Sequence, residues 1–184
     1  MRIRQIGDPI LRQVSSAVDP DDIGGGDIVA LIANIKRILN GIKSISEENG
    51  NALSAPQVGS SVRLIVLRID GEFQTMINPV FTALSNTSFE FEEECFSLYD
   101  RRATLERYYE VEVNYLDETA THRTQTLIGE NAGLVQHEID HLNGVLFLDR
   151  LAQAGRSSRS VDEVLSDQPQ TLKRVKRMIE YMTA

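Results

Sequence analysis

Apolar residues at helical spacing mark three segments of the chain as helices. Ile and Leu recur at gaps of three and four over residues 28–47, which predicts an amphipathic helix. Gly24-Gly25-Gly26 breaks the chain before this segment, and Asp27 stands in an N-cap position. The same spacing predicts a second helix over residues 131–143 and a third over residues 172–182.

Branched and alternating apolar runs between these helices predict strands. The run at residues 61–69 is typical of a buried strand, and Asp70-Gly71 predicts a hairpin that leads into the next strand. The remaining strands are expected at 72–77, as a loosely alternating pair within 79–92, and as a cleanly alternating pair at 108–116 and 121–128.

The order of these elements predicts the fold class. Grouped strands with helices set apart favour an α+β fold over a doubly wound sheet. Residues 152–170 are polar and contain Gly, Ser and Pro, so we expect a loop there before the last helix. The length of 184 residues suits one domain, and 41% apolar with 25% charged residues is typical of a folded globular chain and disfavours general disorder.

Charge and cysteine content narrow the function classes. The 27 acidic residues against 19 Lys and Arg give a formal net charge of −8, which disfavours general nucleic-acid binding and DNA as a partner. No apolar run is long enough to span a membrane, and Met1-Arg2-Ile3-Arg4-Gln5 lacks the apolar region of a signal peptide. We therefore expect a cytoplasmic protein. The single cysteine, Cys95, excludes an internal disulfide.

The segment His137-Glu138-Ile139-Asp140-His141 carries the strongest chemical signal. On a helix, positions four apart share one face, so both imidazoles can reach one metal ion. Glu138 lies about 100° further round and can take a proton from water at the open side of the metal. The alternative is a helix with two surface histidines. The apolar flanks and the scarcity of histidine, three in the chain, favour the metal.

A catalytic metal site of this kind needs a third protein ligand. Cys95 is the candidate, because its surroundings are too acidic for a cysteine that is merely buried. One thiolate with two imidazoles suits Zn²⁺, and Fe²⁺ in a reducing compartment. A third segment, residues 50–57, ends in Gln57, whose amide can donate to a carbonyl oxygen; its alternative is a turn that leads into a strand.

Together, these three segments resemble the peptide deformylase family. Residues 50–57 match Gly-x-Gly-Leu-Ala-Ala-Pro-Gln, residues 93–97 match Glu-Gly-Cys-Leu-Ser, and residues 136–141 match Gln-His-Glu-x-Asp-His, in the family's order. The opening Asp8-Pro9-Ile10-Leu11-Arg12 is also similar. The resemblance spans roughly residues 3–150, so residues 1–150 are expected to form the catalytic portion. Residues 151–184 would add a loop and a C-terminal helix to the same domain.

The resemblance implies a fold and residue roles. The fold would be mostly antiparallel sheets packed around a central metal-binding helix, with an N-terminal and a C-terminal helix. The substrate would be the N-formyl-methionine of nascent polypeptides, and formate would be released. By this resemblance, a metal ion (Fe²⁺ in the cell, or Zn²⁺ or Ni²⁺) would be bound by Cys95, His137 and His141. Glu138 would act as general base and then as general acid, and the formyl oxygen would be bound by Gln57 and the backbone N–H of Phe96. The residues expected to bind the substrate are Gly50, Asn51, Ala52, Glu94, Gly133 and Leu134.

Several residues depart from the family pattern at the expected substrate cleft. Ala52 replaces a Gly, Ser54 an Ala, Glu94 a Gly and Phe96 a Leu, and Gly133 stands where the family often has Arg. Glu94 could narrow the cleft, favour a basic substrate or raise the pKa of bound water; alternatively it faces solvent.

These departures leave other functions open. One is a divergent paralogue that acts on another N-formyl peptide or metabolite. Another is a catalytically weak, metal-binding paralogue, and a weaker rival is an endopeptidase.

The C-terminal helix is locally basic, with Lys173, Arg174, Lys176 and Arg177 close together. The resemblance implies weak docking on ribosomal RNA through this helix. The alternative is the solvated face of an amphipathic helix.

Overall fold

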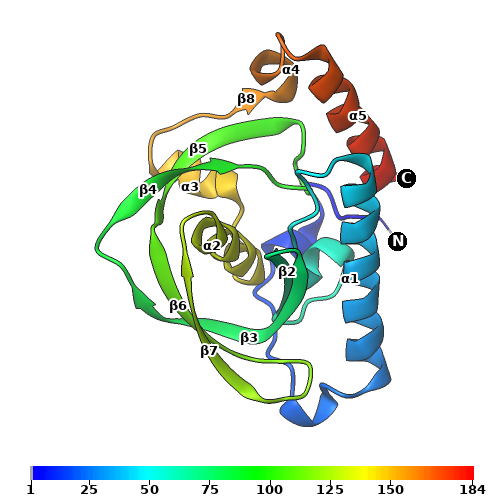
Figure 1. Ribbon diagram of the computed structural model, residues 1–184, viewed down its shortest axis with the longest axis vertical. Coiled ribbons are helices and arrows are strands. Elements are labelled where there is room, and N and C mark those ends of the chain that lie inside the picture. The colour runs from blue at the N-terminus through cyan, green and yellow to red at the C-terminus, as the bar shows by residue number, and fades with distance from the viewer. Residues whose placement is uncertain (1) are drawn as a thin grey trace.

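The computed structural model describes residues 2–184, and its centre is a buried helix (Figure 1). This helix, α2 (Glu130–Leu142), is enclosed by two antiparallel sheets, with α1 and α5 along one flank. In strand order, the larger sheet has β1 (Ala52–Ser54), β2 (Leu64–Ile69), β3 (Glu72–Leu84), β6 (Glu110–Leu116) and β7 (His122–Ile128). The smaller has β4 (Ser88–Glu93), β5 (Arg101–Tyr108) and β8 (Arg159–Ser160).

Four other α-helices and three short 3-10 helices complete the fold of the described residues. The α-helices are α1 (Gly26–Ile45), α3 (Phe147–Gln153), α4 (Val161–Val164) and α5 (Pro169–Thr183). The 3-10 helices are η1 (Pro9–Arg12), η2 (Pro20–Asp22) and η3 (Ala55–Val58). None of the helices in the described part of the chain is both long and apolar enough to cross a membrane.

Helix α2 is buried because one face packs into an apolar core and the other carries a cluster of buried polar side chains. Val135, Ile139 and Leu142 pack into the core of the larger sheet with β-strand residues such as Ile65 and Val113. The remaining surface carries buried polar side chains, including the two histidines of the sequence motif. The apolar core therefore holds the helix rigidly while its polar side chains face the interior.

The C-terminal helix is part of the main core. Val175, Met178 and Met182 of α5 are buried in the same apolar cluster as the inner face of α1. The Tyr181 hydroxyl lies so close to Gly41 of α1 that any side chain there would collide with it. The two ends of the chain also meet, because the Ile3 N–H donates to the Met182 carbonyl at 3.0 Å.

The expected α+β class and the three long helices are confirmed, with shifted boundaries. The first helix begins at Gly26 with Gly25 as its N-cap, so Asp27 lies in the first turn and the N-cap assignment was wrong. The alternation over residues 79–92 proved to be the end of β3 followed by β4, not a strand pair of its own.

Two other parts of the secondary structure differ from the prediction. Residues 152–170 include β8 and α4 as well as loop, so the expectation of a loop alone was wrong. Strand β5 escaped prediction because its inward positions include Arg102 and Arg107, which hide the apolar alternation.

Candidate metal centre and active site

Three predicted ligands meet at the inner surface of α2. Ligand atoms of Cys95, His137 and His141 all lie within 4.8 Å of one another, and all three residues are buried. The histidines are one turn apart on α2, and Cys95 follows β4; its Sγ lies 3.2 Å from His141 Nε2. One sulfur and two imidazole nitrogens make a donor set that fits a borderline-soft divalent metal, with room for further ligands.

Glu93 supports this cluster from behind. Its side chain is fully buried, and its Oε2 accepts a hydrogen bond of 2.6 Å from His137 Nδ1, which leaves His137 Nε2 for a metal. Arg107 Nε donates to Glu93 Oε1 at 2.7 Å, and its Nη1 donates to Asp140 Oδ2 at 2.7 Å. Burial tends to raise the pKa of Glu93, but His137 and Arg107 outweigh it and hold the pKa below its ordinary value.

Sequence reasoning matched Glu93 to a motif but gave it no role. Residues 92–94 are all glutamates, so residue type alone does not distinguish Glu93 from its two neighbours. The usable signal was alternation, because Phe91, Glu93 and Cys95 all point inward while the residues between them are exposed.

Glu138 lies at the wall of a cavity beside this cluster. It is 3% exposed, and its Oε2 has no hydrogen-bond partner among the described residues. Burial raises the pKa of Glu138 to about 7. A carboxyl group in this state can accept and release a proton near neutral pH.

Gln57 directs a hydrogen-bond donor toward the same place. Its Oε1 accepts hydrogen bonds of 2.9 Å from both the backbone N–H and the hydroxyl of Ser54. This fixes the amide so that Nε2 faces Cys95 Sγ at 3.7 Å and Ser97 Oγ at 3.3 Å. Ser54, one of the departures from the family pattern, therefore orients the amide.

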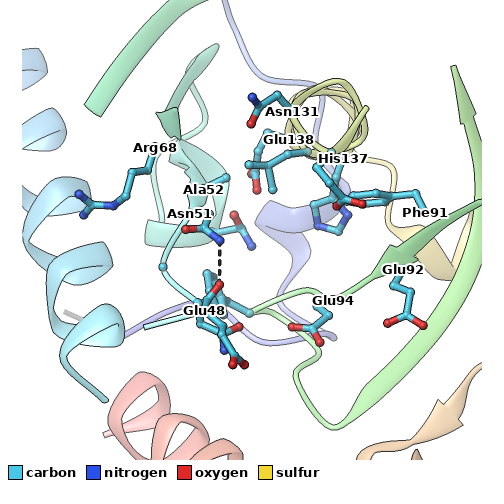
Figure 2. A pocket seen from close by; sticks show the side chains of 16 residues that line it. Glu48, Asn51, Ala52, Arg68, Phe91, Glu92, Glu94, Asn131, His137 and Glu138 are labelled. Atoms are coloured by element: carbon cyan, nitrogen blue, oxygen red, sulfur yellow. Dashed lines mark hydrogen bonds between the residues drawn. The ribbon is translucent and has the colours of Figure 1, made fainter. Parts of the chain in front are cut away.

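The cavity in front of these groups has a volume of about 380 Å³ (Figure 2). It lies between β1 and β4, each of which is the outermost strand of its sheet. Gln57, Phe96, His137 and Glu138 line it, as do five of the residues expected to bind substrate: Gly50, Asn51, Ala52, Glu94 and Leu134.

Gly133 does not belong to that lining. The ring of Phe91 covers its α-carbon, and a Cβ on Gly133 would lie 2.5 Å from Phe91 Cδ2. Phe91 itself lines the cavity. The missing side chain on α2 is thus replaced by a ring from β4, and Gly133 affects the cavity only through Phe91.

Two further departures, Glu94 and Phe96, belong to one cluster around Tyr99. Glu94 lines the cavity but is paired, with Oε1 at 2.7 Å from Arg102 Nε. The Arg102 guanidinium lies 4.3 Å from the centre of the Tyr99 ring, and Phe96 stacks with that ring at 5.4 Å. The Tyr99 hydroxyl donates to Asn49 Oδ1 at 2.7 Å, which joins the loop after Cys95 to the opposite cavity wall. Sequence reasoning missed Tyr99 and Arg102.

The site defines a class of enzyme. A buried Cys-His-His group, a carboxyl group with a free oxygen and an oriented amide converge on one cavity. This combination is that of a metal-dependent hydrolase that acts on an amide.

Comparisons with known proteins identify the family within this class. The polypeptide deformylase family model matches residues 1–157. Peptide deformylase from Treponema pallidum (strain Nichols) is 35% identical over 156 residues, which are 85% of this chain and 91% of the relative. A Met-Ala-Ser-bound class I type b peptide deformylase from Acinetobacter baumannii superposes with a TM-score of 0.73 at 28% identity, covering 82% and 97% of the chains. The crystal structure of peptide deformylase from Thermotoga maritima superposes with a TM-score of 0.68 at 33% identity, covering 81% of this chain and 95% of that one.

The chain belongs to the peptide deformylase family. It is a metallohydrolase that removes the N-formyl group from nascent polypeptides, as the resemblance of its motifs implied.

Proposed function

We propose that Cys95, His137 and His141 hold one divalent metal ion, Fe²⁺ in the cell, and that Zn²⁺ or Ni²⁺ can replace it. The proposal is supported by the mixed sulfur and nitrogen donor set and by the hydrogen bond that fixes His137 through Nδ1. When bound, the metal supplies Lewis acidity toward a water molecule and the formyl oxygen.

The protein side chains supply the proton transfer and the oxyanion donors. Glu138 takes a proton from the attacking water and delivers it to the amine that leaves as the free N-terminus. Gln57 Nε2 and the backbone N–H of Phe96 donate to the formyl oxygen as negative charge develops on it. The observation that carries this proposal is the buried, unpartnered Oε2 of Glu138, which lines the cavity beside the ligand cluster.

The peptide substrate would bind in an extended conformation between the two open sheet edges. Ala52 and the preceding Asn51 line the cavity at the open edge of β1, and the end of β4 forms the opposite wall. An extended peptide gains main-chain hydrogen bonds at such edges. The apolar parts of the wall, Phe91 and Leu134, would contact the methionine side chain.

The test is formate release from formyl-Met-Ala-Ser, chosen because the Acinetobacter baumannii relative was crystallised with Met-Ala-Ser. The protein is purified without oxygen, and its metal content is measured in the same sample. Stoichiometric metal with turnover is expected, and Glu138→Gln should keep the metal while turnover falls by about 10²–10⁴. A fully metal-loaded protein that releases no formate would contradict the proposal.

The alternative functions receive less support. A silent metal-binding paralogue has no need of an oriented Gln57 amide or a free Glu138 oxygen. The Glu94 charge, which suggested another substrate, is paired with Arg102. An endopeptidase of the His-Glu-x-x-His kind would normally use His or Glu, not Cys95, as its third ligand.

We also propose that the protein works in the cytoplasm, where the free Cys95 thiol stays reduced. There, α5 would dock weakly on the ribosome. Lys173, Arg174, Lys176 and Arg177 are exposed, although Lys176 pairs with Asp162 at 2.7 Å. Deletion of α5 would expose the core, so charge reversal is the better test. Lys173→Glu with Arg177→Glu should reduce cosedimentation with ribosomes at low salt. Equal binding by the variant and the parent would refute docking.

A further inference from the structure

A second cavity lies against β5, outside the active site. It has a volume of about 390 Å³ and forms where the chain between α3 and β8 runs beside β5 (Figure 1). Of the described residues, only Glu92 lines both this cavity and the active-site cavity. Three arginines line the second cavity, Arg102 of β5, Arg156 of the loop and Arg159 of β8. Its volume is in the range of cavities that bind small organic molecules.

The local fold explains why these arginines gather. Gly155 follows α3 with a φ of +64°, and the N–H of Arg156 donates to the Leu151 carbonyl at 2.9 Å. This is a common way for a helix to end at a glycine, and it turns the chain back toward β5. Strand β8 then pairs with β5, and Arg159 lies directly opposite Arg102. Directly opposite residues share one face of a sheet, and both of these arginines line the cavity.

This register places two like charges opposite each other, which destabilises a strand pair. Arg102 has a counter-charge, because its Nε lies 2.7 Å from Glu94 Oε1. Arg159 is exposed, and its guanidinium forms no ion pair and no hydrogen bond within residues 2–184. Glu163 does not fill this place, because its carboxylate accepts from the N–H and the hydroxyl of Ser160 at 2.8 and 2.9 Å. The positive charge of Arg159 is therefore left without a close partner.

Other hydrogen-bond donors face the same space. Arg156 Nη1 donates to the Thr104 carbonyl at 3.1 Å, which holds this guanidinium at the cavity wall. Its ion pair with Glu90 is long, 3.6 Å, and the Glu90 side chain is 71% exposed, so the pair is weak. The Ser157 hydroxyl lines the cavity and has no hydrogen bond in the described part of the chain. Among the described lining residues, Glu92 is the one carboxylate that opposes an anion.

We propose that this cavity binds a phosphate group, either as free phosphate or as a small phosphate monoester. A guanidinium presents paired N–H donors that match two phosphate oxygens. A phosphate held by Arg156 and Arg159 would offset the repulsion between Arg159 and Arg102. Beside the arginines, Ala103 and Val164 form an apolar part of the wall, where the organic group of a monoester would lie.

Titration calorimetry with the metal-loaded protein compares inorganic phosphate with phenyl phosphate, at an ionic strength held constant with sodium chloride. Saturable binding of one phosphate per chain is expected. Tighter binding of phenyl phosphate would identify a monoester as the ligand, and equal binding would identify free phosphate; each supports the site. No binding of either probe would overturn the proposal. The measurement needs no turnover, so its outcome is independent of the proposed deformylation.

Charge-neutralising variants locate the bound phosphate. Arg156→Gln and Arg159→Gln should each raise the Kd for phosphate by about tenfold, because each removes a charge-assisted hydrogen bond. Arg37→Gln is the matched control, because Arg37 is an exposed arginine of α1 that does not line the cavity. It should leave Kd unchanged. Equal Kd values for all three variants and the parent would place the phosphate elsewhere, such as at the metal centre, and would overturn the proposal.

Thermal unfolding tests the repulsion between the strands by a separate route. Without phosphate, Arg159→Gln should raise Tm by about 1–3 °C, because it removes the like charge opposite Arg102. Added phosphate should raise the Tm of the parent more than that of this variant, because it stabilises only the form that binds it. A variant that is less stable than the parent without phosphate would show that Arg159 is already compensated, and the inference would fail.

Discussion

Replacement of Glu93 by Gln isolates the residue that supports the metal ligands. Glu93→Gln keeps the shape of the side chain and removes its charge. The wild-type carboxylate is fully buried between His137 Nδ1, at 2.6 Å, and Arg107 Nε, at 2.7 Å. A glutamine oxygen can accept from one of these groups, but its NH₂ then faces the other donor.

The magnitude follows from the remaining partners. Loss of one member of a buried ion pair costs about 3–5 kcal/mol. Arg107 keeps Asp140 at 2.7 Å, so we expect the lower end, about 3 kcal/mol. At about 2–4 °C per kcal/mol for a chain of this size, Tm should fall by about 6–12 °C. Metal affinity should fall by about 10- to 100-fold, because His137 loses the acceptor that orients its ring.

Thermal unfolding and competition with a chelator measure the two effects separately. The matched control is Glu92→Gln, the same chemical change at the exposed neighbouring residue, for which a stability change within about 0.5 kcal/mol is expected. If Glu93→Gln behaves like Glu92→Gln in both assays, Glu93 does not support the ligands and the reasoning fails.

Three further substitutions test the clusters around the cavity. Tyr99→Phe keeps the ring stack but removes the hydrogen bond to Asn49. The KM for formyl-Met-Ala-Ser should therefore rise about fivefold, which corresponds to the free energy of one hydrogen bond, while kcat stays nearly constant. A fall in kcat alone would contradict this prediction. Gly133→Ala should lower the free energy of unfolding, measured by chemical denaturation, by about 1–3 kcal/mol, because the new methyl group collides with Phe91. Phe91→Leu in the same chain should restore most of the lost stability. Equal stability of Gly133→Ala and the parent would refute the contact. Ser54→Ala, which restores the family residue, should reduce kcat by about fivefold, because the amide that it orients loses one hydrogen bond; an unchanged kcat would make Ser54 incidental.

The sequence predicted the parts of the molecule that depend on local periodicity and a short motif. The spacing of His137 and His141 placed both on one helix face, and the apolar flanks predicted that this helix is central. Cys95 was predicted to be the third ligand because it is the single cysteine and lies in an acidic segment, and the structure places it beside the two imidazoles.

The parts that the sequence did not predict depend on contacts between distant segments. Alternation indicates that Glu93 points inward, but its role depends on distant segments, because its partners Arg107 and His137 lie 14 and 44 residues away in the sequence. Tyr99 owes its role to Asn49, on a segment that joins it only in the folded chain. Such pairings depend on how the two sheets are arranged around α2, and this arrangement cannot be predicted from the local patterns of a single sequence.

The departures from the family pattern illustrate the same principle. Taken alone, each is only a departure from the family pattern at the expected cleft, but for three of them the structure shows a neighbouring group that compensates the change. The charge of Glu94 meets Arg102, the missing side chain of Gly133 is filled by Phe91, and the hydroxyl of Ser54 holds the Gln57 amide. Such compensated changes conserve the chemistry of the site.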